Sequence, residues 1–235
     1  VDSIVKFPNY ESKLFIELPN ILFLTYFDTY NDSIFSYVSD KENTLISFFN
    51  SKGELIDTMD IIDKSPIYNL EDLTYESKNY MASYLFTINK SRNTIAIVYA
   101  TSDVIKFLDL KGNELKVLYG PNDHIQIPEY GNLKQKMTNT LVKSDNDFIY
   151  CLYQNNTLLD EASGFTPIRT NLINVYSWSG IPTAQLILNH PIQTFTVDRK
   201  NNRIVTYAPD VDAFEVYQYP DVLLTEIYNE NRNSN

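Results

Sequence analysis

Residues 45–59 read LISFFNSKGELIDTM and residues 104–118 read VIKFLDLKGNELKVL. The two stretches match at an offset of 59 residues, which places Gly53 on Gly112. Each has two apolar segments on either side of a polar Lys-Gly turn, and glycine supplies the positive φ that such a tight connection needs. The repeated unit is therefore predicted to be a β-hairpin.

Further hairpin copies extend along the chain. The first hairpin recurs as LINVYSWSGIPTAQL at 172–186 and as FEVYQYPDVLLTEI at 214–227. A second hairpin recurs as FTINKSRNTIAI at 86–97, LVKSDNDFIYCLY at 141–153 and FTVDRKNNRIVT at 195–206. In each copy β-branched and aromatic residues flank a polar turn, which is typical of antiparallel strands.

Two hairpins in succession give a repeat of four strands, and four-stranded repeats of about 40 residues or more are typical of propeller blades. The predicted fold class is all-β, a β-propeller of four-stranded antiparallel blades. Four blades are visible in the sequence, and five or six are expected in the intact ring. We expect strands at 21–27, 34–38, 44–49 and 54–59 in the first repeat and later repeats beginning near Ser83, Thr138 and Ile192.

The repeats are expected to form one domain. Two short strands at 4–7 and 13–17 precede the first visible blade. We expect residues 1–235 to be a single propeller domain. Either these two strands complete a blade with strands that the sequence does not reveal, or the chain is an N-terminally shortened form of a larger propeller, which is the alternative we prefer. Residues 229–235 read as a polar C-terminal tail.

Composition excludes several classes of partner and site. Lys and Arg number 19 against 30 Asp and Glu, a net charge of −11, which leaves no basic surface for nucleic acid. The single cysteine, Cys151, allows no internal disulfide and no multi-cysteine metal site, and its position within a strand predicts a core residue. No apolar run approaches the roughly 18 residues of a membrane span. We expect a monomer without a cofactor.

The quoted repeats also resemble a known family. The stretch FLDLKGNELKVLYGPNDHIQIPEY at 107–130, FIYCLYQ from Phe148 and the long run from Ile173 that contains FTVD are similar to TolB-like six-bladed β-propeller proteins of Bacteroidetes. The resemblance covers about Phe35 to Pro220. It implies an exported protein, periplasmic or anchored to the envelope as a lipoprotein, and it implies no particular activity.

Three segments between the expected strands are much longer than hairpin loops, namely 60–80, 119–136 and 154–170. In an up-and-down blade all three leave the same face, and binding residues concentrate in long loops on a rigid scaffold. Two simpler explanations stay open: the segments could only cover strand ends, and their aromatic residues could pack on one another. The predicted ligand-binding residues are Tyr119, Asp123, His124, Glu129, Tyr130, Asp160 and Arg169.

Two functions are compatible with this pattern. The first is a binding or scaffold module for a protein or glycan partner, which uses the face with the long segments. The alternative is a propeller hydrolase or lyase acting on a carbohydrate, with a carboxylate or metal site at the channel mouth. We assign no catalytic residue and no metal ligand, because the chain has no GxSxG elbow and its two histidines lie in different repeats. His190 is expected in a short turn at 189–191, and Trp178 in packing at a blade edge.

Overall fold

In the computed structural model almost all of the described chain is β-strand. The described residues are 24–30, 33–39, 44–50, 52–60, 84–100, 102–120, 136–157, 159–160, 164–165 and 169–219. Their sheets are antiparallel, and successive strands pair in the order in which they occur. The all-β propeller architecture predicted from the repeats is confirmed, while the strands expected at 4–7 and 13–17 and the end of the repeat copy at 214–227, from residue 220 on, lie outside the described residues.

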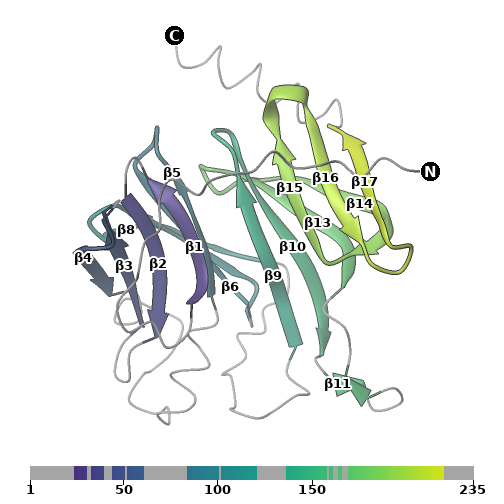
Figure 1. Cartoon of the computed structure of the whole chain (residues 1–235), viewed down its shortest axis with the longest axis horizontal. Helices are drawn as coiled ribbons and strands as arrows, with labels where there is room; N and C mark the ends of the chain where they lie inside the picture. Colours follow the sequence, from purple (N-terminus) through teal and green to yellow (C-terminus); the bar gives the residue numbers. More distant parts are fainter. Residues whose placement is uncertain are drawn as a thin grey trace.

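The first two repeats each form a four-stranded sheet, here called blades 1 and 2. Their first strands contact one another, so the blades are arranged side by side (Figure 1). Blade 1 comprises β1 (Leu24–Tyr30), β2 (Ser33–Ser39), β3 (Thr44–Phe49) and β4 (Leu55–Asp60), and blade 2 comprises β5 (Tyr84–Asn89), β6 (Thr94–Tyr99), β7 (Val104–Asp109) and β8 (Glu114–Tyr119).

Blades 3 and 4 continue the series toward the right of Figure 1. Between the second and third strands of blade 3 lies the small hairpin of β11 (Leu159–Asp160) and β12 (Gly164–Phe165). Blade 3 comprises β9 (Lys136–Ser144), β10 (Phe148–Thr157), β13 (Thr170–Ser177) and β14 (Pro182–Ile192), and blade 4 comprises β15 (Thr194–Asp198), β16 (Arg203–Ala208) and β17 (Ala213–Gln218), with a short 3₁₀ turn at Arg199–Asn201.

The glycine turns that define the repeat have the predicted backbone conformation. Gly53, Gly112 and Gly180 have φ angles of 79°, 79° and 74°. In blade 2 the turn is further held by Asp109, whose Oδ1 accepts hydrogen bonds from the backbone N–H groups of Lys111 and Asn113, each at 2.8 Å. The later repeats begin at Tyr84, Lys136 and Thr194, within two residues of the expected positions.

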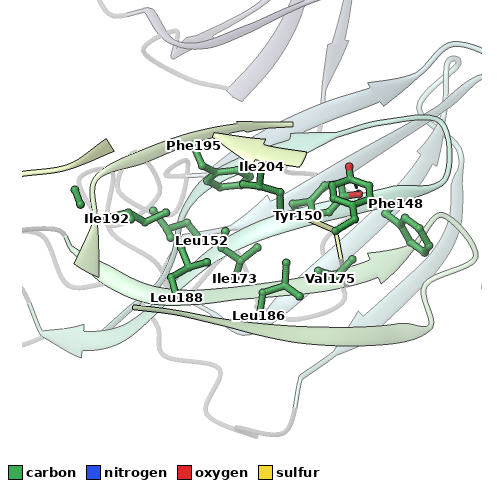
Figure 2. Close-up of a cluster of buried hydrophobic side chains, with 12 residues drawn as sticks. Phe148, Tyr150, Leu152, Ile173, Val175, Leu186, Leu188, Ile192, Phe195 and Ile204 are labelled. Atoms are coloured by element: carbon green, nitrogen blue, oxygen red, sulfur yellow. Dashed lines mark hydrogen bonds between the residues drawn. The ribbon is translucent and has the colours of Figure 1, made fainter. Parts of the chain in front are cut away.

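The core consists of apolar layers between neighbouring blades. Ile95 and Ile97 of β6 belong to the layer toward blade 1, while Ala96 and Val98 belong to the layer toward blade 3. β6 is therefore buried along its whole length. Figure 2 shows the layer between blades 3 and 4, where Tyr150 and Leu152 of β10 point toward Ile204 and Phe195. Cys151 and Trp178 are 0% and 5% exposed, which confirms both as packing residues.

The expected turn at 189–191 was wrong. His190 and Pro191 lie within β14, which runs to Ile192. Proline is tolerated in an outermost strand because no neighbour requires its N–H, and β14 is the last strand in the described order of blade 3. A register shift between β13 and β14 accommodates the extra residues of β14.

Candidate functional site

A pocket of about 370 Å³ lies between blades 2 and 3. It is lined by residues of β7 and β8 on one side and of β13 and β14 on the other. Its size falls within the usual range for sites that hold a small ligand or a few residues of a peptide. We call it the interblade pocket.

The two walls of the interblade pocket differ in chemistry. Blade 2 contributes the aliphatic side chains of Ile105 and Leu118. Blade 3 contributes the amides of Asn174 and Gln185 together with Tyr176 and apolar side chains, namely Val175, Pro182 and Ala184. Gln185 Nε2 donates a hydrogen bond of 3.0 Å to Asn174 Oδ1, so the two amides face one another across β13 and β14. Both walls can therefore pack against apolar groups, and the amides on the blade 3 side can also exchange hydrogen bonds with a ligand.

One end of the pocket carries a carboxylate. Asp103 precedes β7 directly and is 8% exposed. The backbone N–H of Gly120 donates to the Asp103 carbonyl at 2.7 Å, which places the end of β8 beside the carboxylate. Tyr153 Oη donates a long hydrogen bond of 3.4 Å to Asp103 Oδ2. The acidic end thus lies where the chain leaves β8.

The turn that carries Asp103 is fixed by side chains of β9. Thr138 Oγ1 lies 3.1 Å from the carbonyl oxygen of Ala100 and 2.9 Å from that of Ser102. Asn139 Nδ2 donates to the carbonyl of Tyr99 at 3.0 Å. Because these carbonyls are buried, the bonds hold Tyr99, Ala100 and Ser102 against blade 3 and set the position of Asp103.

The groups around the carboxylate are held in their neutral forms. Burial raises the pKa of the Cys151 thiol, and the negative charge of Asp103 raises it further. Burial is also the main cause that raises the pKa of Tyr176, with smaller contributions from Cys151 and Asp103. At neutral pH the thiol and the phenol are therefore uncharged.

Lys116 of β8 connects blade 2 to blade 3 outside the pocket lining. Its Nζ donates to the carbonyl oxygen of Ser179 at 2.7 Å and lies 3.4 Å from that of Gly180. Both carbonyls belong to the turn between β13 and β14. The lysine therefore links blade 2 to blade 3 beside this turn.

Both strands at the mouth of the pocket are edge strands. β8 and β14 are each the last strand in the described order of their sheets. An edge strand presents backbone N–H and C=O groups that can pair with another extended chain. Residues 182–185 of β14 and 118–120 at the end of β8 belong to the pocket lining.

The structure places the predicted site residues in different surroundings. Tyr119 lies in the lining of the interblade pocket and is 52% exposed. Arg169 forms an ion pair with Asp210 of blade 4 and is not part of that lining. Asp160 pairs with Gly164 in the β11–β12 hairpin. Asp123, His124, Glu129 and Tyr130 lie outside the described residues.

Sequence reasoning missed most of the pocket. Asp103 lies in a short turn, and only the long segments were expected to carry a site. Asn174 and Gln185 were overlooked because they stand within strands. Their signal was available: a polar side chain inside an otherwise apolar strand, such as Asn174 between Ile173 and Val175, needs a partner or a solvent-filled space.

A second polar cluster surrounds Asp145 at the turn between β9 and β10. Asp145 Oδ1 accepts from the N–H of Phe148 at 2.8 Å, and Oδ2 accepts from Tyr150 Oη at 2.9 Å. Tyr219 Oη also donates to Oδ2 at 3.2 Å. These bonds occupy the carboxylate, and the cluster joins blade 3 to the end of blade 4 as a structural contact. Within the described ranges, no group of three His, Cys, Asp or Glu residues could hold a metal ion.

Solved structures with similar folds are distant in sequence. The periplasmic gluconolactonase PpgL of Pseudomonas aeruginosa is 8% identical, with a TM-score of 0.46 over 80% of this chain and 47% of its own. The dihydro-heme d1 dehydrogenase NirN is 12% identical, with a TM-score of 0.41 over 82% and 35%. BBS1N, solved in complex with ARL6DN, is 10% identical, with a TM-score of 0.42 over 84% and 55%. The chain thus spans about a third to just over half the length of these proteins.

The family of the chain is assigned from its amino-acid sequence. No curated protein sequence matches the chain. In the part of the chain that is described, no helix is both long enough and apolar enough to cross a membrane. Residues 4–200 match the model of the family described as TolB-like 6-blade propeller-like, which is most of the chain. The chain therefore belongs to the TolB-like 6-blade propeller family.

Proposed function

We propose that this chain is a binding module for a protein partner, an extended segment of which occupies the interblade pocket. The single observation that carries the proposal is the pocket itself, in which aliphatic side chains of blade 2 face both the amides and the apolar side chains of blade 3. The edge strands β8 and β14 favour a peptide over a glycan, because an edge strand pairs with an extended backbone.

The partner approaches the pocket from the face where the strands end and the long segments 60–80, 119–136 and 154–170 begin. Tyr119 supports this proposal, since it belongs both to the predicted site and to the pocket lining. Its ring offers a flat apolar face and a polar edge at the mouth of the pocket. Asp123, His124, Glu129 and Tyr130 follow Gly120 within one of these segments and are proposed to extend the contact surface.

The proposal also covers the domain organisation of the chain and its location in the cell. Residues 1–235 act as one propeller domain, and the protein works outside the cytoplasm, in the periplasm or at the envelope. Family membership supports this location. Limited proteolysis tests the domain proposal: one protected fragment supports a single domain, and two stable fragments of similar size contradict it.

The experiment is a selection of peptides from a displayed random library. Wild-type chain is the target, and binders are re-tested on Gln185→Trp, whose indole fills the pocket from an exposed position. Gln218→Trp, an exposed glutamine on β17 of blade 4, is the matched control. We expect selected peptides to lose at least tenfold in affinity with Gln185→Trp and to bind Gln218→Trp like wild type.

Two results would contradict the proposed function. Peptides that bind both tryptophan variants equally well would place the binding surface elsewhere. A glycan array that yields ligands sensitive to Gln185→Trp, while the peptide selection yields none, would replace the protein partner with a carbohydrate. Turnover of such a glycan would favour the alternative hydrolase or lyase, with Asp123, His124, Glu129 and Asp160 as the first residues to substitute.

A further inference from the structure

The interblade pocket continues an apolar layer that is already part of the fold. Ile105 and Tyr176 belong to the buried layer between blades 2 and 3, and Leu118 packs against that layer. All three residues also line the pocket. An apolar group that enters the pocket from outside therefore extends an existing interface between the two blades.

The polar groups of the lining are engaged within the protein. Gln185 Nε2 donates to Asn174 Oδ1 at 3.0 Å, so each amide meets part of the other's hydrogen-bonding capacity. Asp103, the one acidic residue of the described lining, is also hydrogen-bonded within the protein. The remaining side chains of blade 3 in the lining are largely apolar, including Val175, Pro182 and Ala184. The space is therefore suited to an apolar side chain.

Two tyrosine rings in the lining favour an aromatic side chain. Tyr176 is 8% exposed, and Tyr119, at the mouth of the pocket, is 52% exposed. Aromatic pairs stabilise a contact by about 0.5–1.5 kcal/mol beyond the area that they bury. The volume of about 370 Å³ leaves room for such a ring.

A second apolar position lies beside the pocket on the same face of β14. Ile187 is 73% exposed and follows Gln185 by two residues, so the two side chains point to the same face of the strand. Asn174 pairs with Gln185 and Leu172 pairs with Ile187, with no register shift between the two pairs. Ile187 and the half-buried Leu172 therefore form an apolar pair next to the two amides of the pocket.

From this arrangement we infer that the partner segment presents two apolar side chains at positions i and i+2, an aromatic one that enters the interblade pocket and a second that packs on Ile187 and Leu172. The inference rests on the proposed function and names the side chains that the surface recognises. A strand that lies along the edge of β14 places alternate residues on one face, so its spacing of two matches that of Gln185 and Ile187.

The test uses two capped tripeptides of identical composition, Ac-Phe-Thr-Phe-NH₂ and Ac-Phe-Phe-Thr-NH₂. The first has its phenylalanines at i and i+2, and either direction along β14 brings one ring to the pocket and the other to Ile187. Binding to the whole chain is followed by NMR through the side-chain NH₂ signals of Asn174 and Gln185, with each tripeptide titrated into the millimolar range. We expect Ac-Phe-Thr-Phe-NH₂ to bind at least fivefold more tightly than its isomer.

Ile187→Ser tests the second position directly. The side chain is 73% exposed, so the substitution leaves the core intact. We expect the difference between the two tripeptides to fall below twofold in this variant. Val216→Ser is the matched control, because Val216 is 54% exposed on β17 of blade 4, and this variant should keep the wild-type difference.

The outcomes separate this inference from the proposed function. Equal binding of the two tripeptides to wild type overturns the spacing and leaves peptide binding in the pocket intact. An unchanged preference in Ile187→Ser overturns the second position, and no change in the two amide signals with either tripeptide overturns the inference as a whole. Shifts of these signals with protein concentration alone would assign the surface to a second copy of the chain.

The peptide selection gives an independent check. Binders that share an aromatic residue and a second apolar residue two positions away support the inference. Binders that lose affinity with Gln185→Trp but lack this pair contradict the inference while they retain the proposed function.

Discussion

The α-carbon of Gly120 lies directly against the carboxyl group of Asp103, so closely that a β-carbon at residue 120 would overlap it. The Gly120 N–H also bonds to the Asp103 carbonyl at 2.7 Å. The last residue before the segment 121–135 therefore sets the space available to the acidic end of the pocket. This contact links the stability of blade 2 to the chemistry of the proposed site.

Gly120→Ala is expected to destabilise the fold. The added methyl displaces the Asp103 carboxylate, and such overpacking typically lowers the free energy of unfolding by about 1–3 kcal/mol. Urea denaturation measures the effect. The double variant Asp103→Ala, Gly120→Ala removes the clash and should recover stability relative to the sum of the single changes. Strict additivity of the two substitutions would contradict the contact.

Gln154→Met is expected to raise the stability of the protein. Gln154 is 4% exposed, and among the described residues it stands out because neither of its amide atoms has a hydrogen-bond partner. An unpaired buried amide is costly, so an apolar side chain of similar shape should increase the free energy of unfolding by about 1 kcal/mol. Urea denaturation provides the measurement.

A matched control for Gln154 is the paired amide of Asn139. Asn139 is 2% exposed and donates to the Tyr99 carbonyl at 3.0 Å. Asn139→Leu should therefore lower the free energy of unfolding by about 1 kcal/mol or more. If Gln154→Met and Asn139→Leu destabilise the protein equally, the hydrogen bonding of the amide does not determine the change in the free energy of unfolding.

Gly112→Val is expected to lower the free energy of unfolding by about 1–3 kcal/mol, because a β-branched residue is strained at a φ of 79°. Gly112→Asn should cost less, since asparagine tolerates the left-handed region. Thermal or urea unfolding of the two variants checks the order. A valine variant as stable as wild type would contradict the turn geometry of the blade 2 hairpin.

The free energy of unfolding should fall at acid pH. Hydrogen bonds hold the pKa of Asp109 and of Asp198 below the ordinary value of 3.8. The largest contribution comes from the Asn113 side chain for Asp109 and from the Asn201 side chain for Asp198. A lowered pKa in the folded state stabilises the fold above the unfolded pKa, and this contribution is lost as pH falls through the folded value. Urea unfolding from pH 6 to 3 should show a decline beginning near pH 4, at about the ordinary pKa of aspartate.

Asp109→Asn isolates one part of this pH dependence. The amide keeps an oxygen that can accept from Lys111 and Asn113, while the titrating group is lost. The variant should therefore show a shallower acid decline than wild type. An unchanged slope between pH 4 and 3 would show that Asp109 does not contribute.

Much of the fold was predictable because its determinants are local. The Lys-Gly turns at Gly53 and Gly112 are short-range signals, and blade boundaries followed from them to within two residues. The burial of Cys151 followed equally from its place in a strand. Pro191 misled the prediction, since proline marks a turn in most contexts but is tolerated in the edge strand β14.

The candidate site was less predictable because it is assembled from two blades. Asp103 and Gln185 are far apart in sequence, and no local pattern records that β7 and β14 line the same pocket. Tyr119 was found because it ends a strand beside a long segment. Asp103 was missed because its turn is short, although its position is fixed by Thr138 from the next blade.

The most direct test of the account is a crystal structure of the chain with one selected peptide. The account predicts an extended peptide between β8 and β14, with its side chains in the interblade pocket against Ile105 and Leu118. A peptide bound elsewhere on the propeller, with the interblade pocket empty, would contradict it.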